Sequence, residues 1–328
     1  MSGSSNGGGG SGTGGAAGTA GSGGTLAGSG GVSGSGGASV THPPVEIASS
    51  VPGDYGQPVA SPGKVEKLTY PVHYYTTQSG GSNTLTTTPR QDDPITKPCN
   101  VYTPPGYDSH TQYPIIFVFH GITDNQETWF ERGSPKPNVL LDSLITSKKI
   151  QPVIAVFPQG NAHKDFATQN SYSDTAGYYL FGNELMNDLL PFIESKYSVR
   201  KDRESRAVCG FSMGGMQTIN IGLSQHLKDF AYFGALSPAP GSFSASQIAS
   251  SVQMQNQPTA YPLGHFYAVV GQSDSTAGGA FDSATKELAQ KGQFITTSNF
   301  SAHKVPGSHV YPVATIGLYN FLRIAFGL

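Results

Sequence analysis

The stretch RAVCGFSMGGMQ, residues Arg206–Gln217, has the pattern of a buried strand that passes through a tight turn into a helix. Its residues 210–214 fit the G-x-S-x-G motif, in which a serine occupies a strained strand-to-helix turn and projects its hydroxyl above a sheet. Glycines suit the positions two before and two after the serine, because side chains there would crowd it. Apolar residues at Met216, Ile219 and Leu223 predict the following helix. Ser212 is therefore a candidate nucleophile, although a glycine-rich turn in an unrelated α/β protein would look the same.

The composition divides the 328 residues into three parts. Residues 1–40 contain 18 glycines, and no ionisable side chain other than His42 precedes Glu46. Such a segment has too little apolar surface to offset its ordering entropy, so we expect residues 1–42 to form a flexible linker. Residues 43–62 carry five prolines and predict a stiffer lead-in that packs on the domain surface. Residues 63–328 suit one α/β domain with a sizeable core.

Several function classes find no support in the sequence. A net charge of −2, with 12% charged residues, gives no indication of nucleic-acid or anionic-membrane binding. No apolar run approaches the roughly 18 residues that cross a bilayer. The sequence lacks the spacing of metal sites and the loops that bind nucleotides, so we expect no metal and no cofactor. Met1 opens directly into the linker without a signal peptide, and we expect the chain to be part of a longer modular, secreted protein.

Strand and helix patterns alternate through the domain, which predicts a largely parallel sheet with right-handed crossovers. Pro71 suits an edge position for the first strand, and we expect a polar loop between the first two strands. The segment 159–179 shows no clear periodicity. The expected strands are 65–75, 97–103, 113–120, 151–158, 206–211, 230–237 and 265–271, with 293–304 extended; the expected helices are 138–148, 182–197 with a break at Pro191, 213–223, 283–291 and 312–326.

A serine nucleophile needs a base, and the base needs an acid that orients it. Where the serine lies in a G-x-S-x-G turn, the acid and then the histidine base follow it along the chain. His309 lies in the loop after the last predicted strand and is our candidate base, with His303 next. Asp274 stands just past the strand HFYAVVG (265–271), at the sheet edge where catalytic groups gather, and is our candidate acid. A turn-capping role is the alternative for Asp274. The positions judged less suitable are His226 and His265 for the base, and Asp229 and Asp282 for the acid.

Acyl-transfer chemistry also requires donors for the oxyanion that develops on the substrate. We expect one donor to be the backbone N–H of Met213, directly after the nucleophile. The second should come from the loop after the strand YPIIFVFH, and the backbone N–H of Ile122 is our candidate. His120 precedes this loop at a strand end, so we expect it to be structural.

With these features in view, the chain from about Cys99 to its C-terminus resembles the family-one carbohydrate esterases. It is most similar to the feruloyl esterase modules of complexes that degrade plant cell walls. The segments that carry the resemblance are VYTPPGY (101–107), FHGITDNQETWF (119–130), ESKYSVRKDRESRAVCGFSMGGMQTINIGL (194–223), GQSDS (271–275) and SHVYPVATIGLYNFL (308–322). The resemblance implies an α/β-hydrolase fold of the esterase-D type, with a central, mostly parallel sheet flanked by helices. It also implies that Ser212, Asp274 and His309 form a catalytic triad.

In the strand order that the resemblance implies, two strands separate the strand of Cys99 from that of Cys209. Three strand spacings of about 4.8 Å place the two residues roughly 14 Å apart. A disulfide requires Cα atoms within about 7 Å. We therefore expect two unpaired thiols.

The resemblance implies a secreted serine esterase that releases hydroxycinnamic acids from feruloylated arabinoxylan or small aryl esters. Residues 1–42 would tether the domain to further modules. Trp129 and the aromatic residues near 166–181 are candidates for stacking on the substrate ring, with core packing as the alternative for each. Two further hypotheses stay open: an acetylxylan or general short-chain esterase of the same fold, and a catalytically silent module that binds polysaccharide.

Overall fold

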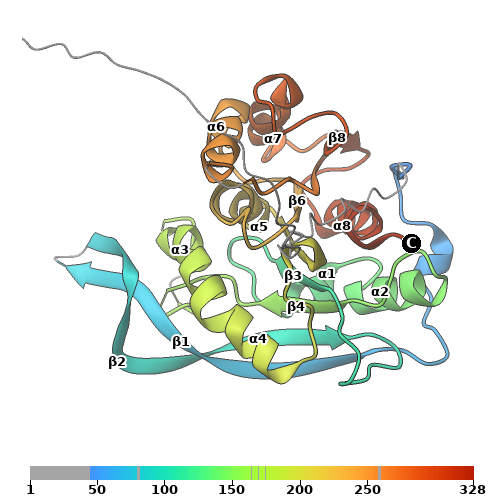
Figure 1. Cartoon of the computed structure of the whole chain (residues 1–328), viewed down its shortest axis with the longest axis horizontal. Coiled ribbons are helices and arrows are strands. Elements are labelled where there is room, and N and C mark those ends of the chain that lie inside the picture. The colour runs from blue at the N-terminus through green and yellow to red at the C-terminus, as the bar shows by residue number, and fades with distance from the viewer. Residues whose placement is uncertain (1–44, 80–81, 164, 169, 174, 258–259) are drawn as a thin grey trace, which may run out of the picture. The chain divides into compact units, whose positions relative to one another are not determined.

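The computed structural model describes residues 45–328 except 80–81, 164, 169, 174 and 258–259. The predicted linker, residues 1–42, lies outside this part of the chain. The described strands form one eight-stranded sheet in the order β1-β2-β4-β3-β5-β6-β7-β8 (Figure 1). Their bounds are Lys64–Ser79 (β1), Ser82–Thr103 (β2), Ile115–Phe119 (β3), Ile154–Pro158 (β4), Arg206–Phe211 (β5), Tyr232–Leu236 (β6), His265–Gly271 (β7) and Phe300–Val305 (β8).

The six strands from β3 to β8 pair in parallel, and β2 pairs antiparallel with both β1 and β4. The predicted mostly parallel sheet is therefore confirmed, with β1 and Pro71 at its edge. The predicted polar loop between the first two strands is wrong. The backbone there continues the ladder to the pair Ser79↔Ser82, and β1 and β2 form a long ribbon that projects beyond the other strands (Figure 1). The threonine-rich composition of this region suits strands.

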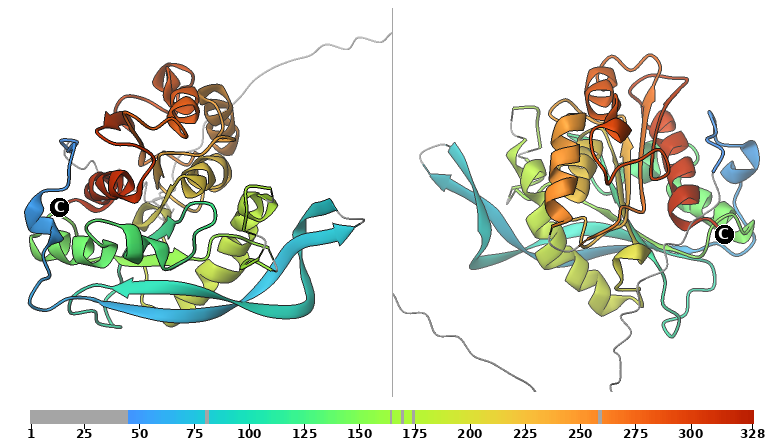
Figure 2. Two further views of the ribbon diagram at one scale, coloured as in Figure 1. Left: turned by 180° about the vertical axis from the view of Figure 1, so that it is seen from behind. Right: turned by 45° about the horizontal axis from the view of Figure 1, so that its top comes forward.

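Helices cover both faces of the sheet (Figure 2). Their bounds are Thr128–Arg132 (α1), Pro137–Thr146 (α2), Ala176–Glu184 (α3), Leu190–Lys196 (α4), Met213–Gln217 (α5), Ala245–Gln255 (α6), Gly278–Thr285 (α7) and Tyr311–Phe326 (α8). Two π-helical segments, Leu185–Leu189 (η2) and Thr218–Leu223 (η4), continue α3 and α5, and short 3₁₀ turns lie at Gly53–Gly56 (η1), Arg203–Ser205 (η3) and Leu288–Gln290 (η5).

Several helix boundaries differ from the predicted ones for local reasons. Pro191 stands in the first turn of α4, so the predicted break at this residue is the start of a new helical segment. The predicted helix 283–291 is broken, because Lys286 has ψ 120° and Glu287 has φ 58°, neither of which is helical. Of the predicted extended segment 293–304, only the part from Phe300 joins the sheet. Helices α1 and α6 were not predicted.

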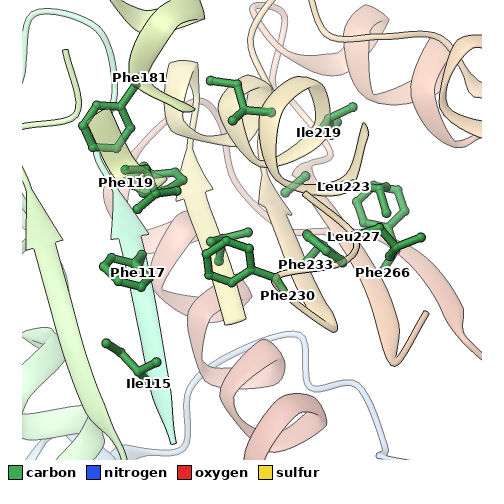
Figure 3. Packing of buried hydrophobic residues seen from close by; sticks show 14 of the residues in the cluster. Ile115, Phe117, Phe119, Phe181, Ile219, Leu223, Leu227, Phe230, Phe233 and Phe266 are labelled. Atoms are coloured by element: carbon green, nitrogen blue, oxygen red, sulfur yellow. The ribbon is translucent and has the colours of Figure 1, made fainter. Parts of the chain in front are cut away.

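The core has two layers, one on each face of the sheet. In β3, Ile115, Phe117 and Phe119 point into one layer and Ile116 and Val118 into the other, as expected of a strand covered on both sides. The first layer packs under α3, α4, α6 and α7, and some of its residues are drawn in Figure 3. The second packs under α1, α2 and α8.

The described part of the predicted lead-in, residues 45–62, contacts α8 through Ala48 and Tyr55. The side chain of Asn320 binds the backbone of Ala48 twice, with Ala48 N–H donating to Oδ1 and Nδ2 donating to Ala48 O, both at 2.9 Å. The rings of Tyr55 and Tyr319 are 5.4 Å apart. These contacts attach the proline-rich segment to the domain surface. The domain boundaries themselves stay predictions.

The two cysteines lie on β2 and β5, with β4 and β3 between them. Both are buried and unpaired, so the predicted pair of free thiols is confirmed. Burial raises the pKa of the Cys99 thiol to about 12, and that of Cys209 further still. Neither thiol is therefore ionised near neutral pH.

Candidate active site

Ser212 stands between β5 and α5 with φ 56° and ψ −112°, a conformation that L-residues rarely adopt. The two glycines of the motif allow this turn. A Cβ on Gly210 would lie 2.5 Å from the carbonyl carbon of Gly214, and a Cβ on Gly214 would lie 2.7 Å from Phe119 O. The amide of Ser212 donates to Leu236 O at 2.9 Å and ties the turn to β6. The predicted strand, tight turn and helix are confirmed.

Three side chains from separate loops form a hydrogen-bonded line. Nε2 of His309 is 2.9 Å from Ser212 Oγ, and Nδ1 of His309 is 2.8 Å from Asp274 Oδ2. The other carboxylate oxygen, Oδ1, accepts the amides of Thr276 at 3.1 Å and Ala277 at 2.8 Å. The Asp274 side chain is completely buried, whereas that of His309 is 22% exposed. The imidazole is thus held by a fixed acceptor on one side and faces the serine on the other.

The other histidines considered as the base contact residues other than Ser212. His226 pairs with Asp229 at 3.0 Å, and His265 with the hydroxyl of Ser301 at 2.8 Å. His303 is on β8, and its ring stacks on Tyr267 with centroids 6.1 Å apart. His120 is buried, and its two ring nitrogens face the carbonyls of Gly121 and Gln159. Asp282 lies inside α7 and pairs with Lys304.

A cavity of about 350 Å³ opens over the serine. This is at the lower end of the size range of small-molecule sites. The lining residues come from the loop after β3, from α1, from the segment before α3, from the turn around Ser212 between β5 and α5 (the elbow), from the loop after β8 and from the start of α8. They are Gly121, Ile122, Thr123, Asp124, Arg132, Tyr172, Phe211, Ser212, His309, Val310, Tyr311 and Pro312.

The two predicted oxyanion donors lie beside Ser212. Gly121 approaches the serine closely enough that a Cβ on it would be 3.5 Å from Ser212 Cβ, and Ile122 follows it along the cavity wall. Met213 is the first residue of α5, so its N–H has no partner within the helix. Within the described chain, neither the Ile122 nor the Met213 amide donates to a turn, loop or side-chain acceptor. Their role as oxyanion donors stays a prediction.

The prediction that Trp129 stacks on the substrate ring is wrong. Its side chain is 1% exposed, Nε1 donates to Phe119 O at 3.0 Å, and its ring meets that of Tyr311 edge to face. The core-packing alternative therefore holds for this residue. Of the aromatic residues near 166–181, Tyr172 lines the cavity and is 80% exposed.

Sequence reasoning missed a polar network at the cavity wall. The hydroxyl of Tyr311 donates to Asp124 Oδ2 at 2.8 Å and accepts the amide of Gly121 at 3.3 Å. Arg132 Nη1 binds the other oxygen of Asp124 at 2.9 Å. Burial, with the Asp124 carboxylate second, raises the pKa of Tyr311 well above its usual value, so the hydroxyl stays protonated and acts as a donor. The network fixes the loop that carries Ile122.

The described residues show neither a metal site nor a membrane-spanning helix. They contain no cluster of three or more His, Cys, Asp or Glu side chains arranged to hold a metal ion. None of the described helices combines the length and the apolar character that crossing a bilayer requires.

The chain matches one protein family and several solved structures. The Esterase family, described as "Putative esterase", matches residues 96–313. A ferulic acid esterase from Anaeromyces mucronatus in complex with ferulic acid superposes with a TM-score of 0.68, 22% identity, and coverage of 85% of this chain and 97% of that one. A serine-to-alanine mutant of the feruloyl esterase module from Clostridium thermocellum, complexed with sinapinate, gives 0.65 and 24%, covering 86% and 96%. These likenesses confirm the α/β-hydrolase fold.

Two curated relatives share more sequence over a shorter span. An endo-1,4-beta-xylanase/feruloyl esterase from Xylanibacter ruminicola is 34% identical over 143 residues, which is 42% of this chain and 19% of that protein. Endo-1,4-beta-xylanase Y from Acetivibrio thermocellus is 34% identical over 152 residues, 43% of this chain and 13% of that protein. The chain thus matches less than a fifth of the length of either relative.

Proposed function

Because this chain belongs to the Esterase family, we propose that it is a serine esterase that releases ferulic or related hydroxycinnamic acids from arabinoxylan. The observation that carries the proposal is the hydrogen-bonded line from Asp274 through His309 to Ser212 at the cavity. The feruloyl group is favoured over other acyl groups because the relative from Xylanibacter ruminicola is a xylanase/feruloyl esterase.

The proposed reaction proceeds in two steps. His309 Nε2 takes the proton of Ser212 Oγ as that oxygen attacks the ester carbonyl carbon, and the buried carboxylate of Asp274 stabilises the resulting imidazolium. The N–H groups of Ile122 and Met213 bind the oxyanion. The carbon–oxygen bond to the sugar breaks, and His309 returns the proton to the departing sugar hydroxyl. Water then attacks the acyl-enzyme through the same base, which releases the acid and restores Ser212.

The cavity offers contacts for an aromatic acyl group. The exposed ring of Tyr172 stands at its wall, together with Ile122 and Val310. Val310 is 42% exposed, so this side of the cavity presents apolar surface to solvent. Stacking on Tyr172 would hold a planar hydroxycinnamoyl ring without a specific hydrogen bond.

We further propose that the chain works outside the cell, joined to other modules through residues 1–42. The glycine-rich composition of this segment suits a tether. The lengths of the two xylanase relatives support a modular setting, since the match covers only 19% and 13% of them.

The test is an activity panel on the wild-type chain and Ser212→Ala. The substrates are methyl ferulate, methyl p-coumarate, methyl caffeate, feruloylated arabinoxylan and acetylated xylan. We expect hydrolysis of the hydroxycinnamoyl esters by the wild type, and a loss of at least about 10⁴-fold in Ser212→Ala. Faster turnover of acetylated xylan would favour the acetylxylan esterase alternative. Binding to xylan with no hydrolysis of any ester would overturn the proposal in favour of a silent module.

A further inference from the structure

Asn170, from the irregular segment before α3, holds the backbone of the loop after β3 at two points. Its Oδ1 accepts the amide of Thr123 at 2.8 Å, and its Nδ2 donates to Asp124 O at 2.8 Å. Oδ1 also accepts the hydroxyl of Tyr178 at 2.6 Å. The side-chain oxygen of Asn170 therefore faces two donors and its nitrogen faces an acceptor, so these bonds fix the orientation of the side-chain amide.

The residue held in this way is in an unfavourable conformation. Thr123 has φ 66°, and β-branched residues are outliers in the left-handed region. Such a conformation persists only where the surroundings over-determine it. The two bonds from Asn170 bracket Thr123, one to its own N–H and one to the carbonyl of the next residue.

The conformation of this loop decides which of its amides reaches the cavity. The amide of Gly121 donates to the Tyr311 hydroxyl, that of Asp124 to Gly121 O at 3.4 Å, and that of Thr123 to Asn170. Among these four consecutive residues, all within the described chain, the Ile122 amide is the one left for a ligand. A change of φ at Thr123 would rotate the peptide planes on either side of it and redirect the Ile122 N–H.

Asn170 is itself anchored to the elbow. Tyr178, which binds its Oδ1, is completely buried and packs with Met213 and Ile122. Gln217, at the end of α5, donates from Nε2 to Tyr178 O at 2.9 Å and to Gly160 O at 2.8 Å. The segment that carries Asn170 is thereby tied to the helix that follows Ser212. The same set of hydrogen bonds therefore connects the loop of Ile122 with the helix of Met213, the two expected oxyanion donors.

We propose that Asn170 is a positioning residue for catalysis, which holds Thr123 in its left-handed conformation and so aims the Ile122 N–H at the substrate oxyanion. This inference rests on the proposed esterase function. It gives the segment between β4 and α3 a part in the chemistry, in addition to its place in the cavity wall.

The test compares Asn170→Ala with the wild type in steady-state hydrolysis of methyl ferulate. Removing an oxyanion donor costs about 10²–10³-fold in kcat, and a misaimed donor should cost roughly 10- to 100-fold with little change in KM. Affinity for an aryl boronic acid, which forms a tetrahedral adduct with Ser212, should fall with kcat, while affinity for ferulate should not. The matched control is Asn299→Ala, since Asn299 also bridges two backbone groups, Thr296 N–H at 2.7 Å and Phe294 O at 2.9 Å.

A second variant separates loop positioning from general destabilisation. Thr123→Gly removes the steric cost of the left-handed conformation. The double variant Asn170→Ala/Thr123→Gly should therefore have a higher kcat than Asn170→Ala alone. An unchanged kcat in Asn170→Ala, or a double variant no faster than the single one, would overturn the inference.

Labelling of Ser212 by a fluorophosphonate tests the role of Asn170 without the natural ester. The phosphonyl oxygen is stabilised by the same N–H donors as the substrate oxyanion, so the labelling rate also depends on their position. A wild-type chain that reacts with the fluorophosphonate but hydrolyses no hydroxycinnamoyl ester would overturn the proposed substrate class only. In that case the labelling rates of the same variants decide the role of Asn170. Circular dichroism melting checks that each variant is folded.

Discussion

Asp274 holds His309 by a hydrogen bond of 2.8 Å while two backbone amides bind the other oxygen of its carboxylate. The carboxylate therefore cannot turn away from the imidazole without losing these amide bonds. Its complete burial strengthens the interaction with a protonated imidazole, because solvent does not screen it. A carboxylate can only accept a hydrogen bond, so this arrangement favours the tautomer with Nδ1 protonated, and in the proposed reaction Nε2 accepts the proton of Ser212.

Replacing Asp274 by Asn should lower kcat for methyl ferulate by roughly 10⁴-fold, as expected when the base is held in the wrong tautomer. KM should change little. Asp282→Asn is the matched control, because Asp282 lies in α7 and pairs with the exposed Lys304. Near wild-type turnover in Asp274→Asn would contradict the assignment.

Tyr172→Ala should raise KM for hydroxycinnamoyl esters up to about tenfold, which corresponds to an aromatic stacking contribution of about 0.5–1.5 kcal/mol. The ring is 80% exposed, so stability should change by less than about 0.5 kcal/mol. Tyr179→Ala is the control: its ring is 40% exposed but does not line the cavity. An equal effect of both changes would show that Tyr172 makes no special contact.

Gly214→Ala should destabilise the fold by about 1–3 kcal/mol and reduce activity with it, because the new methyl group would meet the backbone oxygens of Phe119 at 2.7 Å and His120 at 2.8 Å. Gly278 begins α7 and has open space where a Cβ would stand, so Gly278→Ala should be neutral. Urea denaturation measures both. A Gly214→Ala chain as stable as the wild type would mean that the elbow can relax.

Lys97→Met should cost about 3–5 kcal/mol of unfolding free energy. Its ammonium pairs with Glu184 at 2.6 Å, both side chains are completely buried, and Tyr70 donates to the same carboxylate. Adding Glu184→Gln to Lys97→Met should recover part of the loss, because the uncompensated charge is then gone. Lys304→Met, in an exposed pair with Asp282, should cost less than about 1 kcal/mol. The prediction fails if both lysine changes cost the same.

His265 should make the fold less stable in acid. Burial, with the nearby His303 as a smaller cause, lowers the pKa of His265 to about 4, whereas the unfolded chain protonates it near pH 6.5. The unfolded state therefore binds more protons between these values, and the contribution is complete above pH 6.5 and lost as the pH falls to 4.

Between pH 7 and pH 4.5, the unfolding free energy of the wild type should therefore fall by about 2 kcal/mol more than that of His265→Gln. This value allows for the partial exposure of the His265 side chain. Urea titrations at several pH values measure this difference, in which the contributions of the other titrating groups cancel. His110→Gln, at an exposed turn, controls for the loss of an imidazole alone. Parallel pH curves for the wild type and His265→Gln would contradict the argument.

The sequence predicted the central strands and the relative order of Ser212, Asp274 and His309 because these features depend on local signals. Runs such as YPIIFVFH are apolar on both faces, and a polar residue just after such a run marks the sheet edge where ligands bind. Chain order then left few histidines to consider. The side chains that form the hydrogen-bonded line are those predicted, while their catalytic roles stay a prediction.

What sequence reasoning missed depends on contacts between distant segments. Asn170 gave no signal, because its role arises from where the segment before α3 meets the loop of Thr123. Helix α6 was missed because it is mostly polar, although Ser244 and Gln247 form a capping box that could have marked its start. Trp129 was assigned wrongly because the sequence does not show whether an aromatic side chain near a site faces the cavity or the core.

The two cysteines have a practical consequence for handling this protein. The sequence contains only Cys99 and Cys209, and both are buried and unpaired within the folded chain. The fold therefore has no bridge to break, and strong reductants should leave it intact. A cysteine introduced at an exposed position such as Ser283 would be the only thiol open to maleimide reagents in the native state. The protein could thus be attached to a surface or carry a dye at one chosen point, without removing either natural cysteine.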